Sequence, residues 1–363
     1  MINREILIFE TIAVKDNIGY GSDYNRNGLF QVDLTTGQSE YIGVFESELM
    51  NRQRLHCSAL YIDDRIYFIP GSGNYIDIFY PDSNEQETVE IPLPKYKQYS
   101  FYDSQYKFVT AIKRGNVLWL IPVTYPGVVK FDILTKEITV YNDWLEDDEY
   151  MFRNGIYIEG NSFVVANGKN NTVLIFDMEK EFGKIEHIGE HNNGMMSVCK
   201  LGDELWFAPR LHGAIMKRNC TTGKIDEFED FPQEFISGRL VFTGNYTYNE
   251  KVIFVPLLSN YALVYENGEI KIDNTKPWKI YQKSGIELLF ETEGFRFYRE
   301  VSIGEKDRCF KVSKKNDELT EFEFYFNDDG KRERDVVKVT SSKQSDILEN
   351  KIVGIREFIK GIL

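Results

Sequence analysis

The feature that most constrains the fold is a repeat of about 47 residues. Segments that start at Asp63, Gly115, Leu201 and Asn249 share one pattern. Each has a polar turn, an apolar strand that ends in proline, a short loop, a second apolar strand, a polar turn and a third strand. A further strand precedes each copy, so every unit contains four short strands that alternate apolar and polar residues.

Two positions fix the alignment of the copies. The second strand of a unit ends at a proline in four copies, and in the copy near residue 160 we expect Ala166 to take its place. A second marker is the polar residue that follows the third strand. It falls at Asp33, Tyr80, Asp132, Asp177, Asn219, Glu266 and Ser313.

Four-stranded units repeated around an axis form a β-propeller, which leaves few sheet edges exposed. The aromatic content of 14% also favours strands. We predict an all-β, seven-bladed β-propeller over residues 1–340, and a six-bladed one is the alternative because the last unit matches the repeat least well. The units start near Glu5, Arg54, Lys107, Arg153, Met195, Gly238 and Ile286.

Residues 341–363 are predicted to form a C-terminal amphipathic helix. Asp346 can cap it, with Glu349 three residues later. An apolar stripe follows at helical spacing, at Leu348, Ile352, Ile355, Ile359 and Ile362. Such a helix either packs against a blade or docks a partner or a second copy of the chain, so a homo-oligomer is possible.

Charge and cysteine content exclude several classes of function. The net charge of −14 argues against nucleic acid and anionic membranes as partners. The sequence shows no signal peptide and no membrane-spanning run. The same net charge makes the protein acidic. The four cysteines form no C-x-x-C pair, which predicts reduced thiols, no structural zinc and a cytoplasmic location.

The repeat resembles a known family. The segment GDELWFAPRLHGAIMKRNCTTGKIDEF, which begins at Gly202, is similar to the repeat of virginiamycin B lyase-like propellers, as are Gly28–Phe45 and GVVKFDILTKEITVY. Kelch-type and NHL-type propellers share the general pattern. The resemblance implies the propeller architecture. It also implies, for the lyases, a divalent metal held by His and Glu at the channel mouth, but their His-containing loop motifs are not visible here, so no catalytic residue is carried over.

Candidate binding residues lie on the loops at one end of the predicted propeller. The loops that join the second strand to the third, and the connections from one unit to the next, open on the same face around the central channel. Aromatic, amide and guanidinium groups there suit a peptide, a glycan or a carboxylate-bearing ligand, although Asn and Gly also simply make turns. The candidates are His56, Tyr75, Tyr125, Arg153, Asn154, Asn167, Arg210, His212, Arg239, Asn260 and Tyr261.

No catalytic motif accompanies this pattern, and we predict no cofactor and no metal. His56, His191 and His212 lie on connections that share the face, so a shared metal site is a weaker alternative, since loop histidines are usually solvated. We therefore expect a binding module for a protein, peptide or glycan-like ligand at the channel mouth. The alternative is a metal-assisted lyase or hydrolase acting on a peptide-like or sugar-like substrate at the same face.

Overall fold

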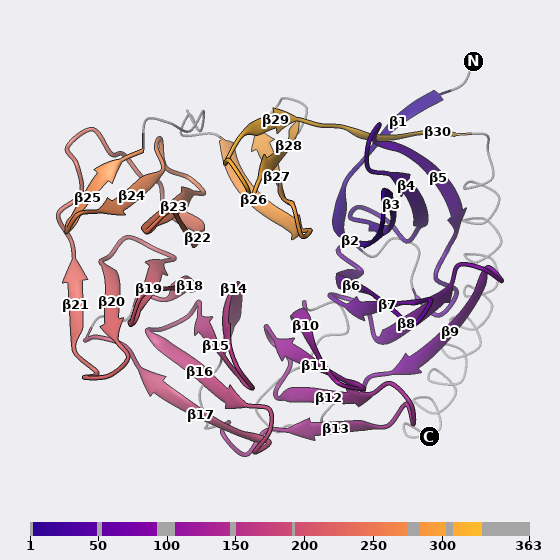
Figure 1. The fold of residues 1–363 in the computed structure, drawn as a ribbon, viewed down its shortest axis with the longest axis horizontal. Helices are drawn as coiled ribbons and strands as arrows, with labels where there is room; N and C mark the ends of the chain where they lie inside the picture. The colour runs from indigo at the N-terminus through magenta and orange to yellow at the C-terminus, as the bar shows by residue number, and fades with distance from the viewer. Residues whose placement is uncertain are drawn as a thin grey trace, which may run out of the picture.

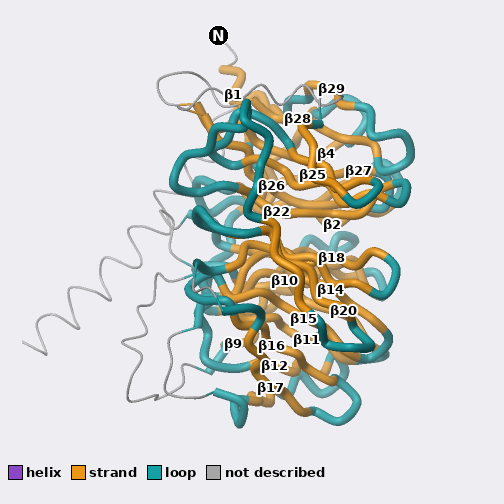
Figure 2. The backbone as a smooth tube through the Cα atoms, turned by 90° about the vertical axis from the view of Figure 1, so that its left-hand side faces the viewer, coloured by secondary structure: helices purple, strands orange, loops and turns teal. Residues whose placement is uncertain are grey.

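Six four-stranded antiparallel sheets and one six-stranded sheet are arranged around a central channel in the described part of the chain (Figure 1). The computed structural model describes residues 3–48, 53–92, 106–145, 150–190, 193–273, 284–302 and 308–328. Strands run between two layers of loops, as the side view shows (Figure 2). No helix occurs in these ranges, and therefore none of membrane-spanning length.

The seven blades follow one another along the chain, each with its strands in the order a, b, c and d from the channel outwards. Blade 1 contains β2 (Phe9–Lys15), β3 (Ile18–Asp23), β4 (Leu29–Asp33) and β5 (Gln38–Gly43). Blade 2 contains β6 (His56–Ile62), β7 (Arg65–Pro70), β8 (Tyr75–Tyr80) and β9 (Glu85–Glu90). Blade 3 contains β10 (Phe108–Arg114), β11 (Val117–Pro122), β12 (Val128–Asp132) and β13 (Ile138–Tyr141). Blade 4 contains β14 (Phe152–Glu159), β15 (Ser162–Asn167), β16 (Thr172–Asp177) and β17 (Phe182–His187).

The remaining blades repeat the same order. Blade 5 contains β18 (Met195–Leu201), β19 (Glu204–Pro209), β20 (Ile215–Asn219) and β21 (Ile225–Phe228). Blade 6 contains β22 (Phe242–Tyr248), β23 (Lys251–Pro256), β24 (Leu263–Glu266) and β25 (Glu269–Ile272). Blade 7 contains β26 (Ser284–Glu291), β27 (Phe295–Ser302), β28 (Arg308–Ser313) and β29 (Leu319–Glu321). The predicted seven-bladed architecture is confirmed, whereas the predicted C-terminal helix lies outside the described residues.

Two further strands complete blade 1 on its outer side. β30 (Phe324–Asp328) pairs in parallel with β5, and β1 (Asn3–Leu7) pairs antiparallel with β30. The sheet therefore has six strands, in the order β1-β30-β5-β4-β3-β2. A strand that follows blade 7 is thereby hydrogen-bonded to blade 1, which ties the two ends of the ring together.

The hydrophobic core lies between neighbouring sheets. One cluster joins Trp119 and Ile121 of blade 3 to Phe163 and Phe176 of blade 4, and the other blade pairs have equivalent clusters. Successive side chains of a strand point to opposite faces of its sheet, and each sheet packs against a neighbouring sheet on both faces. Each fully buried aromatic or aliphatic side chain contributes about 1.5–3 kcal/mol to folding.

The two repeat markers have clear structural roles. Asn167, and not Ala166 as the sequence predicted, occupies the proline position, because Asn167 pairs with Phe152 as Pro70 pairs with His56. Asp33, Asp132 and Asp177 each accept backbone N–H bonds within the turn between strands c and d. The polar marker is therefore a turn-forming residue, as Asn and Asp often are.

Strand a has a register shift at its first residues in blades 1 to 6. The shift falls between Phe9 and Thr11 in blade 1, and between Phe152 and Ile156 in blade 4. Such β-bulges re-aim side chains, and these lie at the end of the channel where the loops between strands b and c are found. Glu10 and Arg153 both directly follow the first paired residue of strand a, and so they are equivalent positions in blades 1 and 4.

Candidate binding face at the channel mouth

The b–c loops and the connections between blades form one continuous rim. The N–H of Lys107, before blade 3, donates to the carbonyl of Gly71 in the b–c loop of blade 2, at 2.7 Å. Val241, before blade 6, makes the same bond with Arg210 of blade 5, at 3.0 Å. The b–c loops of blades 1, 2, 3 and 5 are therefore held by the start of the next blade, which gives the side chains on this part of the rim a rigid base.

One side of the rim carries charges that neutralise one another. Arg54 reaches the carboxylate of Glu10 with both Nε and Nη2, at 3.1 Å and 2.7 Å, and the Tyr106 hydroxyl donates to the same carboxylate at 2.8 Å. Glu10 is buried, and desolvation raises the pKa of its carboxyl although Arg54 opposes that shift. The guanidinium of Arg54 also lies over the Tyr106 ring, 4.3 Å from its centre.

The same network extends to blade 7. Arg54 lies 3.6 Å from Glu287, and Arg299 contacts Glu287 at 2.8 Å. Arg299 also donates to the Tyr24 hydroxyl at 3.1 Å. We call Glu10, Arg54, Tyr106, Glu287, Arg299 and Tyr24 the paired cluster. It connects blades 7, 1, 2 and 3 through groups of both signs.

The opposite side of the rim carries arginines that contact no carboxylate among the described residues. Arg153 follows the start of β14, and its Nη2 donates only to the sulfur of Met151, at 2.7 Å. Its Nε is buried and has no hydrogen-bond partner. Burial, together with the charges of Arg210 and Arg54, lowers the pKa of Arg153 to about 10. The cause of this lowering is the partial removal of the guanidinium from water next to other positive charges.

Gly168 brings two of these arginines together. A Cβ at Gly168 would lie 2.5 Å from Nε of Arg153, so the Arg153 side chain packs directly on the glycine. Arg210 donates from Nη1 to the Gly168 carbonyl, at 3.0 Å. Burial and the charge of Arg239 lower the pKa of Arg210. Within the described ranges, no ion pair joins Arg153, Arg210 or Arg239 to a carboxylate, and we call these three residues the arginine cluster.

Several other predicted site residues serve the framework. His56 is fully buried between blades 1 and 2, where Nε2 donates to Asp77 at 2.8 Å and Nδ1 lies 2.9 Å from the Ser22 hydroxyl. The Oδ1 of Asn167 accepts from the N–H groups of Met151 and Lys169. Tyr125 is buried, and its hydroxyl donates to the Pro92 carbonyl at 2.6 Å.

The remaining predicted residues lie on the rim itself. Asn260 joins two loops, because its Oδ1 accepts from Ile236 and its Nδ2 donates to the Glu234 carbonyl. The exposed His212 lies 3.2 Å from the Ser237 hydroxyl. Tyr75 and Tyr261 are partly buried, Arg239 is exposed, and Asn154 lies within β14.

Two of the three histidines considered for a metal site, His56 and His212, have other partners in the described chain. His56 is buried between two blades and contacts Asp77, His212 contacts the Ser237 hydroxyl, and His191 lies outside the described residues. No group of three or more His, Cys, Asp or Glu suited to a metal occurs among the residues that the structure describes.

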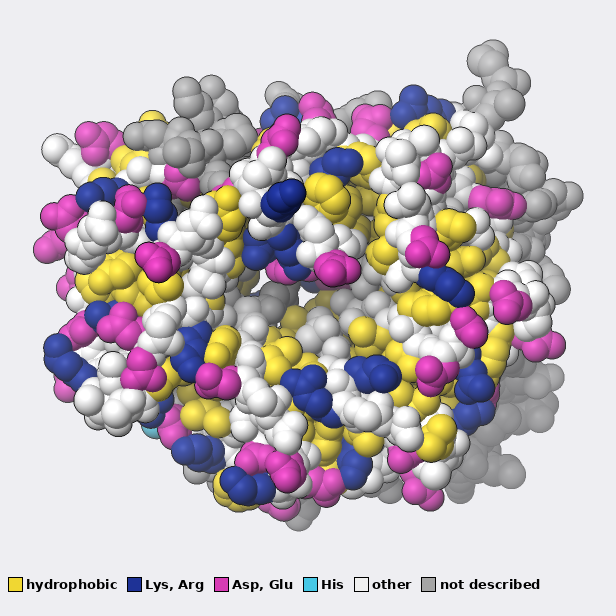
Figure 3. Space-filling model, in the orientation of Figure 1, with side chains coloured by type: hydrophobic (Ala, Val, Ile, Leu, Met, Phe, Trp, Pro, Cys, Tyr) yellow, Lys and Arg dark blue, Asp and Glu magenta, His cyan; other side chains and the backbone are white. Residues whose placement is uncertain are grey.

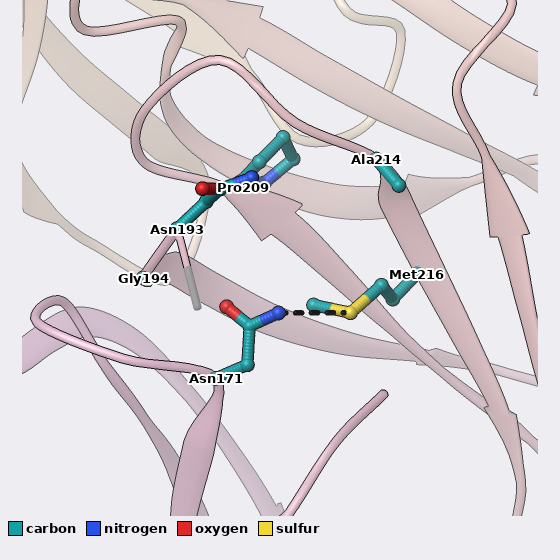
Figure 4. A pocket seen from close by; sticks show the side chains of 6 residues that line it. All are labelled: Asn171, Asn193, Gly194, Pro209, Ala214 and Met216. Atoms are coloured by element: carbon teal, nitrogen blue, oxygen red, sulfur yellow. Dashed lines mark hydrogen bonds between the residues drawn. The ribbon is translucent and has the colours of Figure 1, made fainter. Parts of the chain in front are cut away.

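A small hollow lies between blades 4 and 5 on the same rim. Figure 4 shows Asn171, whose Nδ2 donates to the sulfur of Met216 at 3.5 Å. Asn193, Gly194, Pro209 and Ala214 complete its lining. The space is too narrow to admit a water molecule, and so we do not place the ligand there.

The sequence reasoning missed the acidic half of the paired cluster. Glu10 interrupts an otherwise apolar stretch, Ile6–Val14, which is a signal for a carboxylate with a specific partner. Glu287 and Arg299 carry no such signal, because blade 7 matches the repeat least well. In the space-filling view, basic and acidic side chains are scattered over the visible face around the channel opening (Figure 3).

Comparison with known proteins identifies the architecture. No family model matches the chain, and no curated protein matches its sequence. Virginiamycin B lyase from Staphylococcus aureus is similar in structure, with a TM-score of 0.56 and 14% identity over 88% of this chain and 98% of the lyase. BamB from Moraxella catarrhalis has a TM-score of 0.53 and 12% identity, covering 87% of this chain and 86% of BamB. At these identities the likeness shows the fold alone: the chain is a seven-bladed β-propeller.

Proposed function

We propose that this protein is a binding module that takes a ligand or a protein partner on the rim of its channel, at blades 4 to 6. The observation that carries the proposal is the arginine cluster. Arg54 and Arg299 of the same rim contact carboxylates, whereas Arg153 and Arg210 contact only a thioether and a carbonyl among the described residues. Donors that the fold leaves without acceptors are available to a ligand.

The stability of the rim supports this assignment. Backbone hydrogen bonds hold both loops in place before any ligand arrives: Val241 of the next blade donates to Arg210, and Gly168 donates to Met151, which precedes its own blade. A preorganised site loses less conformational entropy on binding than a flexible one. Rigid propeller walls with recognition groups on the loops therefore suit binding, and solved propellers of this shape include both an enzyme and BamB.

A panel of peptides, soluble glycans and organic acids tests the proposal by thermal shift. The double variant Arg153→Gln/Arg210→Gln should lose the stabilisation that a ligand gives to the wild type. Arg114→Gln is the matched control, because Arg114 lies at the turn between strands a and b, at the other end of the blades. The proposal is wrong if every ligand of the wild type stabilises the double variant equally.

The alternative is a metal-assisted lyase or hydrolase at the same face. It rests on one observation, the buried carboxyl of Glu10 beside Tyr106 with a raised pKa, since such a group can act as a general acid. Metal analysis of the purified protein separates the two functions. Bound divalent metal, together with a lower melting temperature in a chelator, would favour the enzyme.

A further inference from the structure

The arginine cluster also indicates which class of ligand it accepts. We infer that it is an oxyanion site for one ligand that carries at least two carboxylate or phosphate groups and spans blades 4 to 6. This inference rests on the proposed binding function and adds the chemistry of the ligand. Its starting point is that the three guanidinium groups come from three consecutive blades, on β14, on the β19–β20 loop and before β22.

The first argument is convergence. Arg153 packs on Gly168, and Arg210 donates to the carbonyl of the same glycine. Two guanidinium groups thus contact one residue. Neighbouring arginines also affect each other electrostatically: after burial, the charge of Arg210 lowers the pKa of Arg153, and the charge of Arg239 lowers the pKa of Arg210. A ligand with a single anionic group would compensate only part of this row.

The second argument is cost. Like charges held close together and partly removed from water destabilise the fold unless something compensates them. This chain has 57 acidic residues, and Glu87 and Glu204 pair with lysines, yet no carboxylate reaches these arginines in the described ranges. A binding site tolerates such a cost because the ligand supplies the missing acceptors.

The third argument is geometry of recognition. A guanidinium presents N–H groups in a planar fork that matches the two oxygens of a carboxylate or the edge of a phosphate. Arg153 retains a buried Nε without a partner, so it has a donor to offer. The carboxylate groups can belong to an acidic peptide or to a free polycarboxylate, because both present the same acceptor oxygens.

Titration calorimetry at low and moderate salt tests the inference with four probes. They are citrate, inorganic phosphate, an end-blocked tetraglutamate peptide and the matching tetraglutamine peptide. We expect at least one anionic probe to bind, with affinity that falls as salt is raised, and no binding of tetraglutamine. Arg153→Gln and Arg210→Gln should each lower the affinity about tenfold or more, because each removes a charged hydrogen bond.

Gly168→Ala tests the geometry without changing any charge. The added methyl must displace the Arg153 side chain, so the affinity for the anionic probe should fall several-fold. Gly43→Ala is its control, because a Cβ there meets no atom within 4 Å, and it should bind as the wild type does. Unchanged affinity in Gly168→Ala and in both arginine variants would overturn the site and show an adventitious ion only.

The probes also identify the source of the anion. Tighter binding of tetraglutamate than of citrate assigns an acidic peptide, the reverse assigns a small polycarboxylate, and a preference for phosphate assigns a phosphorylated ligand. If no anionic probe binds while a neutral peptide or glycan does so through this rim, the inference fails and the proposed binding function stands. If the arginine variants affect no ligand of any kind, both fail.

Discussion

Two equivalent positions on opposite sides of the channel mouth have opposite fates. Glu10 in blade 1 and Arg153 in blade 4 each follow the first residue of strand a, at the bulge. Glu10 is contacted by Arg54 and Tyr106, whereas Arg153 has no carboxylate among the described residues. The same repeat position therefore holds a paired carboxylate in blade 1 and, in blade 4, a guanidinium that contacts no described carboxylate. The proposed binding site therefore lies on a part of the rim that differs in charge from the part that stabilises the fold.

Replacing Arg54 by Met should have the largest effect on this comparison. The Glu10 carboxylate would stay buried but lose the two hydrogen bonds and the positive charge that Arg54 supplies. Removing one partner of a buried pair costs about 3–5 kcal/mol. Urea unfolding at neutral pH measures this loss, and a loss below about 1 kcal/mol would contradict the structural role of the paired cluster.

The loss in Arg54→Met should also depend on pH. Burial already raises the pKa of Glu10, and without Arg54 the pKa rises further. A carboxyl with a raised pKa in the folded state contributes stability below its unfolded pKa, and that contribution is lost as the pH rises through the folded value. The deficit relative to wild type should therefore shrink on acidification towards 4.5, the ordinary pKa of a glutamate carboxyl. Melting temperatures across this range measure it, and a deficit that grows instead would refute the assignment.

Replacing Arg153 by Met should change the free energy of unfolding in the opposite direction and by a smaller amount. Arg153→Met removes a poorly compensated cation and keeps an unbranched side chain over Gly168. We expect the free energy of unfolding to rise by about 1 kcal/mol, because sites kept for binding often reduce stability. Urea unfolding of the ligand-free protein checks this prediction. A clear loss of stability would mean that Arg153 has a structural partner.

The smallest effect is expected far from both clusters, at Asp132 in the turn between β12 and β13. Backbone N–H groups of Thr135 and Leu134 lower the pKa of its carboxyl. Asp132→Ala should lower the melting temperature slightly at neutral pH. The difference from wild type should disappear as the pH falls through the lowered pKa of Asp132, below the ordinary value of 3.8, because the stabilisation exists only when the carboxyl is ionised. Anion binding should be unchanged in this variant, and calorimetry of both proteins compares them.

The repeat was sufficient to predict the blades because turn residues and alternating strands recur locally, at fixed spacing. It placed Arg153, Arg210 and Arg239 on the rim for the same reason. It did not reveal that His56 is buried, because its partners Ser22 and Asp77 come from strands of two blades. Nor did it show that Arg54 is neutralised and Arg153 is not, because the difference depends on contacts between blades that lie far apart in sequence.

The outer strands of blade 1 determine how the ring responds to force. β1 and β30 are antiparallel, and Asn3 pairs with Asp328 at one end of their ladder. Tension applied at these two residues loads the backbone hydrogen bonds one pair after another, as in unzipping, instead of all at once in shear. The ladder should therefore peel from residue 3 towards Leu7 at low force. An optical-tweezers trace would then show a small first extension before any blade unfolds.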